Sequence, residues 1–497
     1  MEDSNESNRH TEDGRHRRYL MCRSSGCLPG GVLSHSPKLP RVEWRGPKWT
    51  SHSGTEWELL RDDSEWGTNG GGTVFQITPT GKITTLYNFC SQANCTDGEK
   101  PEASLVQTAD GNLYGTTFSG GAHCVSTGGC GTLFEITAAG QLTTLYSFCS
   151  QPNCTDGTGP TAAPIQGLSG SFYGTTYGGG ANCVSTGGCG TVFEITPAGA
   201  LTTLYSFCSQ PNCTDGKEPA GGLVQARSGS FYGTTSYGGA SCSSDTNCGT
   251  VFEITPAGEL TTLYSFCSQP NCSDGDFPWA GLVQASNGNF LGTTVNGGSS
   301  DFGTVFEITP AGRLTTLFSF GYIDGAYPYA GLMQATNGDF YGTTYYGSAN
   351  GSGSIFEITP EGQLATIYSF CSQINCTDGE APSAGLLQAT NGSFYGVTSE
   401  GGTGGNNGTV FSLSVGLGPF VAIRPGAGKV GSPVVILGND LTGSTGVSFN
   451  GAAAALTVVS STEIVATVPS GATTGYVQVT TFSSWTLTSN VKFRVLP

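Results

Sequence analysis

A single phrase, GTVFEIT-PAG-xLTTLYSF, recurs along this chain and constrains its architecture more than any other feature. Six copies begin at residues 72, 131, 190, 249, 303 and 353, and a truncated seventh copy, GTVFSLSV, begins at residue 408. The copies are therefore 50 to 59 residues apart. Repeats of this length, built from short β-type segments, are typical of architectures in which each repeat is one supersecondary unit that stacks on its neighbours.

Each repeat contains two predicted β-hairpins. The first has the pattern GLVQA-xxG-xFYGTT with an Asn-Gly, Asp-Gly or Ser-Gly turn, and the second is TVFEIT-PAG-xLTTLYSF. Asn, Asp and Gly tolerate the positive φ angles of tight hairpin turns, and TVFEIT alternates between two faces as a half-buried strand does. Four strands per repeat therefore predict the blade of a β-propeller.

Counting these hairpins predicts the number of blades. The last repeat ends after its third strand near Val415, so a strand from the amino terminus would complete that blade and close a ring. We therefore predict an all-β fold with a seven-bladed β-propeller. Six or eight blades are the alternatives to this count, and a linear β-solenoid is the alternative architecture.

The first 63 residues differ from the rest of the chain. Residues 1–70 hold ten of the 19 Lys and Arg residues and four of the six Trp residues. Residues 56–63 are EWELLRDD, and shifting the frame of a back-translation by one base gives NGNFYGTT, the hairpin that this repeat lacks. We interpret residues 1–63 as a non-native or disordered segment, so the true signal peptide would be missing from it. Chance codon compatibility is the alternative.

Sixteen cysteines after residue 70 form eight local pairs. The pairs are Cys90/Cys95, Cys124/Cys130, Cys149/Cys154, Cys183/Cys189, Cys208/Cys213, Cys242/Cys248, Cys267/Cys272 and Cys371/Cys376. A repeat that lacks one member of a pair lacks both, which predicts disulfides whose expected role is to pin the tips of loops. Zinc binding is the alternative, although no histidine accompanies the pairs. Disulfides indicate an oxidising compartment, and hence a secreted, periplasmic or cell-surface protein.

Charge and motifs argue against several classes of function. The formal charge of −17 disfavours binding to nucleic acid or to anionic membranes, which need a basic surface. No apolar segment approaches the ~20 residues that span a bilayer. No catalytic residue, metal or cofactor is predicted, because motifs such as GxSxG and HExxH are absent and His123 is a lone loop histidine.

Two polar residues recur in every repeat. The Asp of the DG step is expected to close a turn, with Ca²⁺ binding as the alternative. The Gln of LVQA is expected to hydrogen-bond neighbouring backbone rather than a ligand. The Asp residues are Asp97, Asp156, Asp215, Asp274, Asp324 and Asp378.

One group of aromatic residues breaks the symmetry of the repeats. The loop DGxxPxAG carries charged or small residues in other copies but two aromatic residues in each of two consecutive copies, and further tyrosines flank it. The residues are Phe277, Trp279, Tyr322, Tyr327, Tyr329, Tyr345 and Tyr346. Consecutive blades are neighbours, so we expect these rings on one rim, where they can stack on sugar rings. Packing between blades is the alternative.

The repeated phrases also resemble a known family. GTVFEITPAG, LTTLYSF and NGNFYGTT, over residues 64–416, resemble the GloVer tandem-repeat family of bacterial secreted proteins. Residues 417–497 resemble an IPT/TIG domain, a small immunoglobulin-like sandwich, through Pro425, Gly428, Gly431, Gly451 and the segments 434–441 and 468–479. The resemblance implies extracellular display and a ligand-contacting or spacer module. It implies no reaction.

These observations together predict a secreted or cell-surface, non-catalytic binding or scaffold protein. Its expected partner is an extracellular polysaccharide or another surface protein. A propeller-type polysaccharide hydrolase or lyase is one alternative, and a purely structural surface stalk is another.

Overall fold

The computed structural model describes the backbone of residues 33–35, 50–53 and 57–63. It also describes residues 68–496 except 79–80, 109–110, 125–129, 168, 184–187, 227, 243–247 and 405. These residues form an all-β fold whose helical elements are short 3₁₀ turns. The turns are η1 (Ala93–Cys95), η2 (Pro152–Cys154), η3 (Pro211–Cys213), η4 (Pro270–Cys272) and η5 (Ile374–Cys376). No helix among them is long and apolar enough to cross a membrane.

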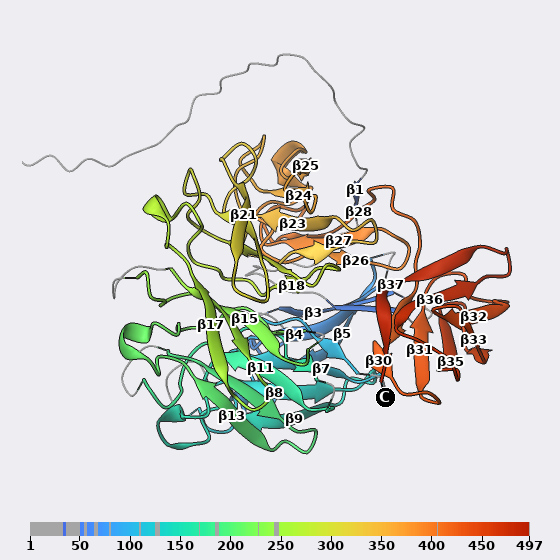
Figure 1. The fold of residues 1–497 in the computed structure, drawn as a ribbon, viewed down its shortest axis with the longest axis horizontal. Coiled ribbons are helices and arrows are strands. Elements are labelled where there is room, and N and C mark those ends of the chain that lie inside the picture. Colours follow the sequence, from blue (N-terminus) through green and yellow to red (C-terminus); the bar gives the residue numbers. More distant parts are fainter. Residues whose placement is uncertain are drawn as a thin grey trace, which may run out of the picture. The chain divides into compact units, whose positions relative to one another are not determined.

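Among the described residues, seven antiparallel sheets of four strands each follow the repeats, and such sheets are the units that form propeller blades (Figure 1). The first strands are β2 (Thr50–Ser53), β6 (Val106–Gln107), β10 (Ile165–Gln166), β14 (Val224–Gln225), β18 (Val283–Gln284), β22 (Met333–Gln334) and β26 (Leu387–Gln388). The second strands are β3 (Trp57–Asp63), β7 (Leu113–Thr117), β11 (Phe172–Thr176), β15 (Phe231–Thr235), β19 (Phe290–Thr294), β23 (Phe340–Thr344) and β27 (Phe394–Thr398).

The second hairpin of each repeat supplies the other two strands. The third strands are β4 (Thr73–Ile77), β8 (Thr132–Ile136), β12 (Thr191–Ile195), β16 (Thr250–Ile254), β20 (Thr304–Ile308), β24 (Ser354–Ile358) and β28 (Thr409–Leu413). The fourth strands are β5 (Ile83–Asn88), β9 (Leu142–Ser147), β13 (Leu201–Ser206), β17 (Leu260–Ser265), β21 (Leu314–Ser319) and β25 (Leu364–Ser369). In the last sheet, β1 (Leu33–His35) pairs with β28 in the fourth position (Figure 1).

Hydrophobic side chains join each sheet to the next. The third strand of most sheets is buried on both faces, because its Val and Phe face neighbouring sheets on opposite sides. One cluster combines Val192 of β12 with Phe252 of β16, and the same pattern repeats along the chain. Another cluster combines Phe75 of β4 with Val410 of β28, and so joins the first sheet to the last.

Buried hydrogen bonds add a second link between consecutive sheets. The first Thr of each FYGTT strand donates from its hydroxyl to a carbonyl in the loop that leads to the following sheet. Thr234 donates to Ala280 at 2.9 Å, and Thr293 donates to Ala330 at 3.1 Å. Because both partners are buried, these bonds fix the loops DGxxPxAG against the neighbouring sheet.

Strand β3 has an unusual register for its sequence. It pairs with β4 so that Arg61 lies opposite Phe75. In the equivalent pairs the residue opposite Phe is Gly, as in Gly115 opposite Phe134, and a Cβ at Gly115 would lie 2.6 Å from that ring. The shifted frame, NGNFYGTT, would place Gly at position 61. This supports the interpretation of residues 1–63 as out of frame, which stays a hypothesis.

The carboxy-terminal residues form two further sheets. One contains β29 (Ala422–Arg424), β31 (Pro433–Leu437), β35 (Glu463–Thr467) and β34 (Leu456–Val458). The other contains β30 (Ala427–Gly428), β37 (Thr486–Val495), β36 (Gly475–Thr480), β32 (Gly446–Phe449) and β33 (Ala452–Ala454). Ile436 and Ile464 from the first sheet share one hydrophobic core with Phe449, Val477 and Phe493 from the second.

Candidate functional site

The loop DGxxPxAG carries most of the aromatic residues selected from the sequence. The second residue after its DG step has a left-handed backbone, with φ of 59° at Phe277 and 57° at Tyr327. Gly159 fills this position in a sister repeat. Side chains other than Gly are strained there by about 1 kcal/mol. Backbone bonds hold the strained residues, because Phe277 N–H donates to Cys248 and Tyr327 N–H donates to Phe302, both at 3.0 Å.

Six aromatic rings form a cluster that we call the tyrosine patch. They are Phe302, Tyr322, Tyr327, Tyr329, Tyr345 and Tyr346. The ring centroid of Phe302 lies 5.6 Å from that of Tyr322 and 5.7 Å from that of Tyr327. Tyr346 then lies 6.4 Å from Tyr327 and 4.5 Å from Tyr345, which is 5.6 Å from Tyr329. All of these contacts are edge-to-face, a preferred geometry for aromatic pairs.

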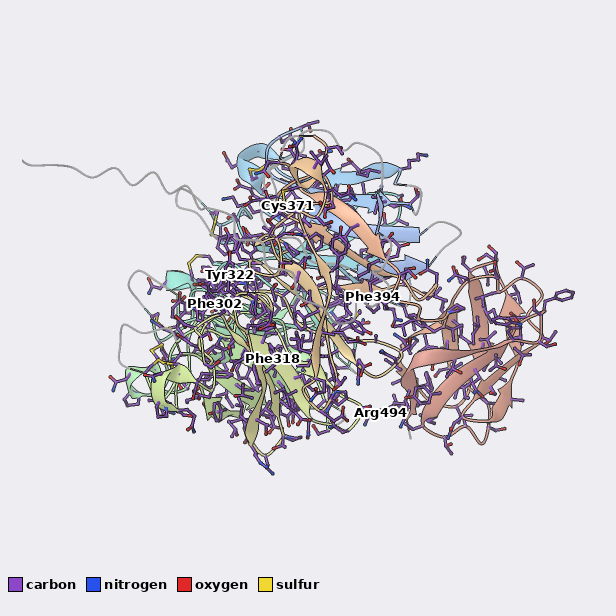
Figure 2. The ribbon with its side chains drawn as sticks, turned by 90° about the horizontal axis from the view of Figure 1, so that it is seen from above. Phe302, Phe318, Tyr322, Cys371, Phe394 and Arg494 are labelled. Atoms are coloured by element: carbon purple, nitrogen blue, oxygen red, sulfur yellow. A yellow bond between two sulfur atoms is a disulfide. The ribbon has the colours of Figure 1, made fainter. Side chains whose placement is uncertain are left out.

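Two rings of the patch occupy positions that hold cysteines in other repeats. The carbonyl of Tyr322 accepts from Ser348 N–H at 2.8 Å, as the carbonyl of Cys272 accepts from Gly298 N–H at 2.9 Å. Phe302 corresponds in the same way to Cys248. The repeat that lacks both disulfides therefore has one ring in place of each, and these rings contact each other (Figure 2).

The tyrosine patch presents phenol groups to solvent. Tyr322 is 48 % exposed, Tyr346 is 44 % exposed and Tyr329 is 36 % exposed. Partial burial raises the pKa of Tyr329 above its usual value, and neighbouring Tyr327 and Tyr346 raise it further. Burial also raises the pKa of Tyr346, followed by Tyr345 and Glu400. The Tyr329 and Tyr346 hydroxyls are therefore neutral at physiological pH and can both donate and accept hydrogen bonds.

Phe277 and Trp279 belong to a different ring cluster, which we call the tryptophan box. It consists of Tyr177, Tyr237, Phe277 and Trp279. The centroid of Trp279 lies 6.0 Å from that of Tyr177 and 5.5 Å from that of Phe277, which lies 5.1 Å from that of Tyr237. All four side chains are half-buried. Among the described residues, no ring contact joins the box to the tyrosine patch, so the seven predicted residues divide between two clusters.

Phe302, Tyr177 and Tyr237 were not predicted from the sequence as members of these clusters. Aligning the repeats could have found the last two, because Tyr177 occupies the position of Tyr345 and Tyr237 that of Tyr346. The alignment of the repeats gives a weaker signal for Phe302, since this residue follows an acidic residue in a loop that is shorter than its counterparts. Its correspondence to a cysteine depends on the backbone hydrogen bonds.

All sixteen repeat cysteines are disulfide-bonded in the predicted local pairs. Some of these sulfurs lie near a carboxylate that could also bind a metal, such as Asp276 beside Cys267 and Cys272. A disulfide sulfur is not the thiolate that binds zinc, so the bonded state disfavours the zinc alternative at these positions.

Pinning of loop tips stays a prediction, and the disulfides between the hairpins also reach the hydrophobic core. Cys130 is bonded to Cys124 as predicted, but its side chain is only 8 % exposed and belongs to the hydrophobic core. Cys189 and Cys248, at the same position of the next two repeats, are also buried. The carbonyl of Cys130 accepts from the N–H of Gly159, in the following DGxxPxAG loop, at 2.9 Å. Because that loop is bonded to its backbone, Cys130 ties a surface loop to the core and is not part of an accessible site.

The recurrent Asp closes its loop with internal hydrogen bonds. Asp215 is 3 % exposed and accepts from Tyr205 Oη at 2.9 Å, Ser209 N at 2.9 Å, Ser209 Oγ at 3.0 Å and Gln210 N at 3.2 Å. Burial would raise the pKa of the equivalent Asp378, but four such bonds lower it below its usual value. The carboxylate oxygens are occupied by protein donors, which favours the turn role over Ca²⁺ binding.

The other polar residues singled out from the sequence also have structural surroundings. Gln225 of one LVQA strand donates from Nε2 to the carbonyl of Gly229 in the following turn at 3.1 Å. Gln388 instead donates to Thr336 Oγ1 of the neighbouring repeat at 3.0 Å. His123 is exposed in a loop.

The carboxyl group of Asp276 has a pKa well above its usual value. Burial, followed by the charge of Asp301, raises the pKa of Asp276 from 3.8 to about 6. Its Oδ1 accepts from Cys248 N at 2.8 Å. Its charge also raises the pKa of Tyr237, after burial and Glu218. Asp276 therefore lies beside the tryptophan box and changes charge near neutral pH.

Comparison with known families accounts for most of the chain. Residues 62–274 and 242–445 match the Gloeobacter/Verrucomicrobia repeat, and residues 420–495 match the IPT/TIG domain. The repeat matches together span more than half of the chain. No curated protein sequence matches the chain significantly.

Several solved structures are similar at low sequence identity. A puromycin hydrolase is 13 % identical with a TM-score of 0.45, covering 80 % of this chain and 61 % of its own. A candidate 6-phosphogluconolactonase from Bacteroides uniformis is 16 % identical with a TM-score of 0.43, covering 66 % and 85 %. A luciferin-regenerating enzyme is 11 % identical with a TM-score of 0.37, covering 79 % and 98 %. At these scores the similarity carries no argument about function.

Proposed function

This chain belongs to the Gloeobacter/Verrucomicrobia repeat family, and we propose that it is a secreted or cell-surface, non-catalytic binding protein whose ligand is an extracellular polysaccharide. The exposed rings of the tyrosine patch are the observation that carries this proposal. The eight disulfides support an oxidising location, because such bonds persist outside the cytoplasm.

The proposed architecture is a seven-bladed propeller followed by an immunoglobulin-like sandwich. Each four-stranded sheet is one blade, and the cluster of Phe75 with Val410 supports a closed ring. The shared core of Ile436 and Phe449 supports a sandwich of the two carboxy-terminal sheets. Propellers place the loops of consecutive blades side by side, which suits binding of an extended ligand.

The chemistry of the tyrosine patch suits sugar rings. A sugar has apolar C–H faces that stack on an aromatic ring and hydroxyls that hydrogen-bond a phenol. Tyr322, Tyr329 and Tyr346 offer both features, because each exposes more than a third of its surface. A purely structural stalk would not need large exposed rings, and among the described residues of the repeats such rings occur only at Tyr322, Tyr329 and Tyr346.

A glycan array with the full-length chain tests the proposal. We expect binding to one polysaccharide class and at least a tenfold loss in the Tyr329→Ala, Tyr346→Ala double variant. Tyr476→Ala is a matched control, because Tyr476 is 41 % exposed in the carboxy-terminal sheets. Binding that survives in the double variant, or that disappears equally in the control, would refute the tyrosine patch as the site. Absence of binding to every glycan would refute a polysaccharide ligand.

A polysaccharide hydrolase or lyase is the second candidate, and Asp276 is the observation that favours it. A carboxyl group with a pKa of about 6 can serve as a general acid or base near neutral pH. Incubating polysaccharides with the protein and measuring new reducing ends or unsaturated products tests this candidate. Turnover that Asp276→Asn abolishes would replace the binding proposal with an enzymatic one.

A further inference from the structure

Carboxylates act on the tryptophan box as they do on Tyr346 of the tyrosine patch, but among the described residues only the box also has a cation over one of its rings. Burial, followed by the neighbouring Glu218 carboxylate, raises the pKa of Tyr177. The charge of Glu218 also acts on Tyr237, so this carboxylate lies close to two walls of the box. Glu218 has φ of 57°, in the same left-handed position that Phe277 occupies in the next repeat. The same loop position thus supplies an acid, Glu218, in one repeat and a ring, Phe277, in the next, and both lie at the tryptophan box.

The chain itself places a cation against this box. Lys217 Nζ lies 5.5 Å from the ring centroid of Tyr237. Aromatic faces attract ammonium groups through their quadrupole, most strongly for Trp and Tyr, and within about 6 Å of the centroid. The internal lysine therefore shows that one wall of the box has the geometry for a cation.

The charge around the box favours a positive ligand. Glu218 and Asp276 act on Tyr237, and Asp301 acts on Asp276, whereas Lys217 is the one described cation over the rings. A primary ammonium such as that of Lys217 is strongly hydrated, and a quaternary ammonium is weakly hydrated. A quaternary group therefore loses less hydration when it enters a site lined by rings.

We propose that the tryptophan box binds a quaternary ammonium or methylated amine group, with Glu218 as its counter-ion and Lys217 as an internal competitor. The proposal does not depend on polysaccharide binding at the tyrosine patch. Trp279 and Tyr177 supply aromatic faces, and Tyr237 becomes available when the flexible side chain of Lys217 moves away. The four side chains are half-buried, so each keeps part of its surface exposed to solvent.

Calorimetric titration of the full-length chain tests this proposal with choline and with 3,3-dimethylbutan-1-ol, its uncharged isostere. We expect choline to bind at least tenfold more tightly than the isostere, because only choline carries the charge. Glu218→Gln removes the negative charge with little change in side-chain size and should weaken choline binding at least tenfold. Lys217→Met removes the competing cation and should tighten choline binding at least threefold.

Tighter choline binding in Lys217→Met cannot result from misfolding, because a damaged box would not bind choline more tightly. Tyr329→Ala, in the tyrosine patch, should leave choline binding unchanged and so separates this proposal from the polysaccharide one. Equal binding of choline and its isostere, no choline binding at 50 mM, or unchanged affinity in Lys217→Met would each overturn the proposal.

Discussion

Replacing the buried Asp of one repeat should destabilise the chain much more than replacing its counterpart in the repeat without disulfides. Asp215 is 3 % exposed and accepts four hydrogen bonds, two of them from backbone N–H groups. Asp215→Ala leaves these donors without the carboxylate. The Tyr205 and Ser209 hydroxyls can rotate toward water, but the two amides cannot.

The size of the effect follows from these contacts. Hydrogen bonds to a charged group contribute about 1.5–3 kcal/mol each, and partial rehydration of the loop reduces the total loss to about 2–4 kcal/mol. For an unfolding unit of about 350 residues, the entropy of unfolding means that a loss of 1 kcal/mol in stability lowers the melting temperature by about 1.4 °C. We therefore expect Asp215→Ala to lower the melting temperature by about 3–5 °C.

Asp324 provides the matched control. In its repeat, Phe318 occupies the position of Tyr205 and has no hydroxyl to donate to Asp324. Asp324 is also only half-buried. Asp324→Ala should therefore cost about 1 kcal/mol or less. Circular dichroism melts of both variants measure the difference, and hydrogen exchange of the Ser209 and Gln210 amides measures the local opening. Equal losses in the two variants, or unchanged exchange of these amides, would show that the reasoning is wrong.

Further predictions address titration, disulfides, sheet contacts and the first repeat. The raised pKa of Asp276 means that the folded state binds this proton more tightly than the unfolded state does. The free energy of unfolding should therefore fall as the pH rises from about 4 to about 6. Asp276→Asn should remove this pH dependence, which amounts to about 1 kcal/mol in the free energy of unfolding after solvent screening. Thermal melts recorded at several pH values measure it. Replacing Cys208 and Cys213 by Ser should cost about 2 kcal/mol in denaturant unfolding, since the closed loop is short. Thr234→Val should cost about 1–2 kcal/mol in the same assay, because Ala280 loses a buried donor. Changing residues 56–63 to NGNFYGTT should raise the melting temperature, because it places Gly opposite Phe75, as in the equivalent pairs of the other repeats; a lower value would count against the frame hypothesis.

Local patterns made much of the fold predictable. The alternation in TVFEIT specifies a strand, and the turn residues that follow specify a hairpin. The paired loss of cysteines indicated which sulfurs are bonded, because both partners of each disulfide lie in one loop. The burial of Cys130 was not predictable in this way, since it depends on the loop of the following repeat. The Asp of the DG step acts within its own loop, so its turn role could be inferred from neighbouring residues.

The candidate site was less predictable, because its contacts cross between repeats. Phe277 and Tyr327 occupy equivalent positions in consecutive copies, which suggested one shared rim. The structure instead places Phe277 with Tyr237 and Trp279 with Tyr177, from earlier repeats. Spacing along the chain cannot give these contacts, since they depend on the direction in which each loop side chain points.

The sequence by itself determined the repeated four-stranded unit, the disulfide pairs and the change of module near residue 417, because each depends on residues close together in the chain. Only the tertiary structure decided that Phe302 and Tyr322 stand where cysteines stand in other repeats, and that Glu218 faces Tyr177. Those relationships arise when stacked sheets bring loops from different repeats together. The physical reason is that strand and turn preferences are local, whereas a binding surface is built from contacts between loops that the stacking of sheets alone makes neighbours.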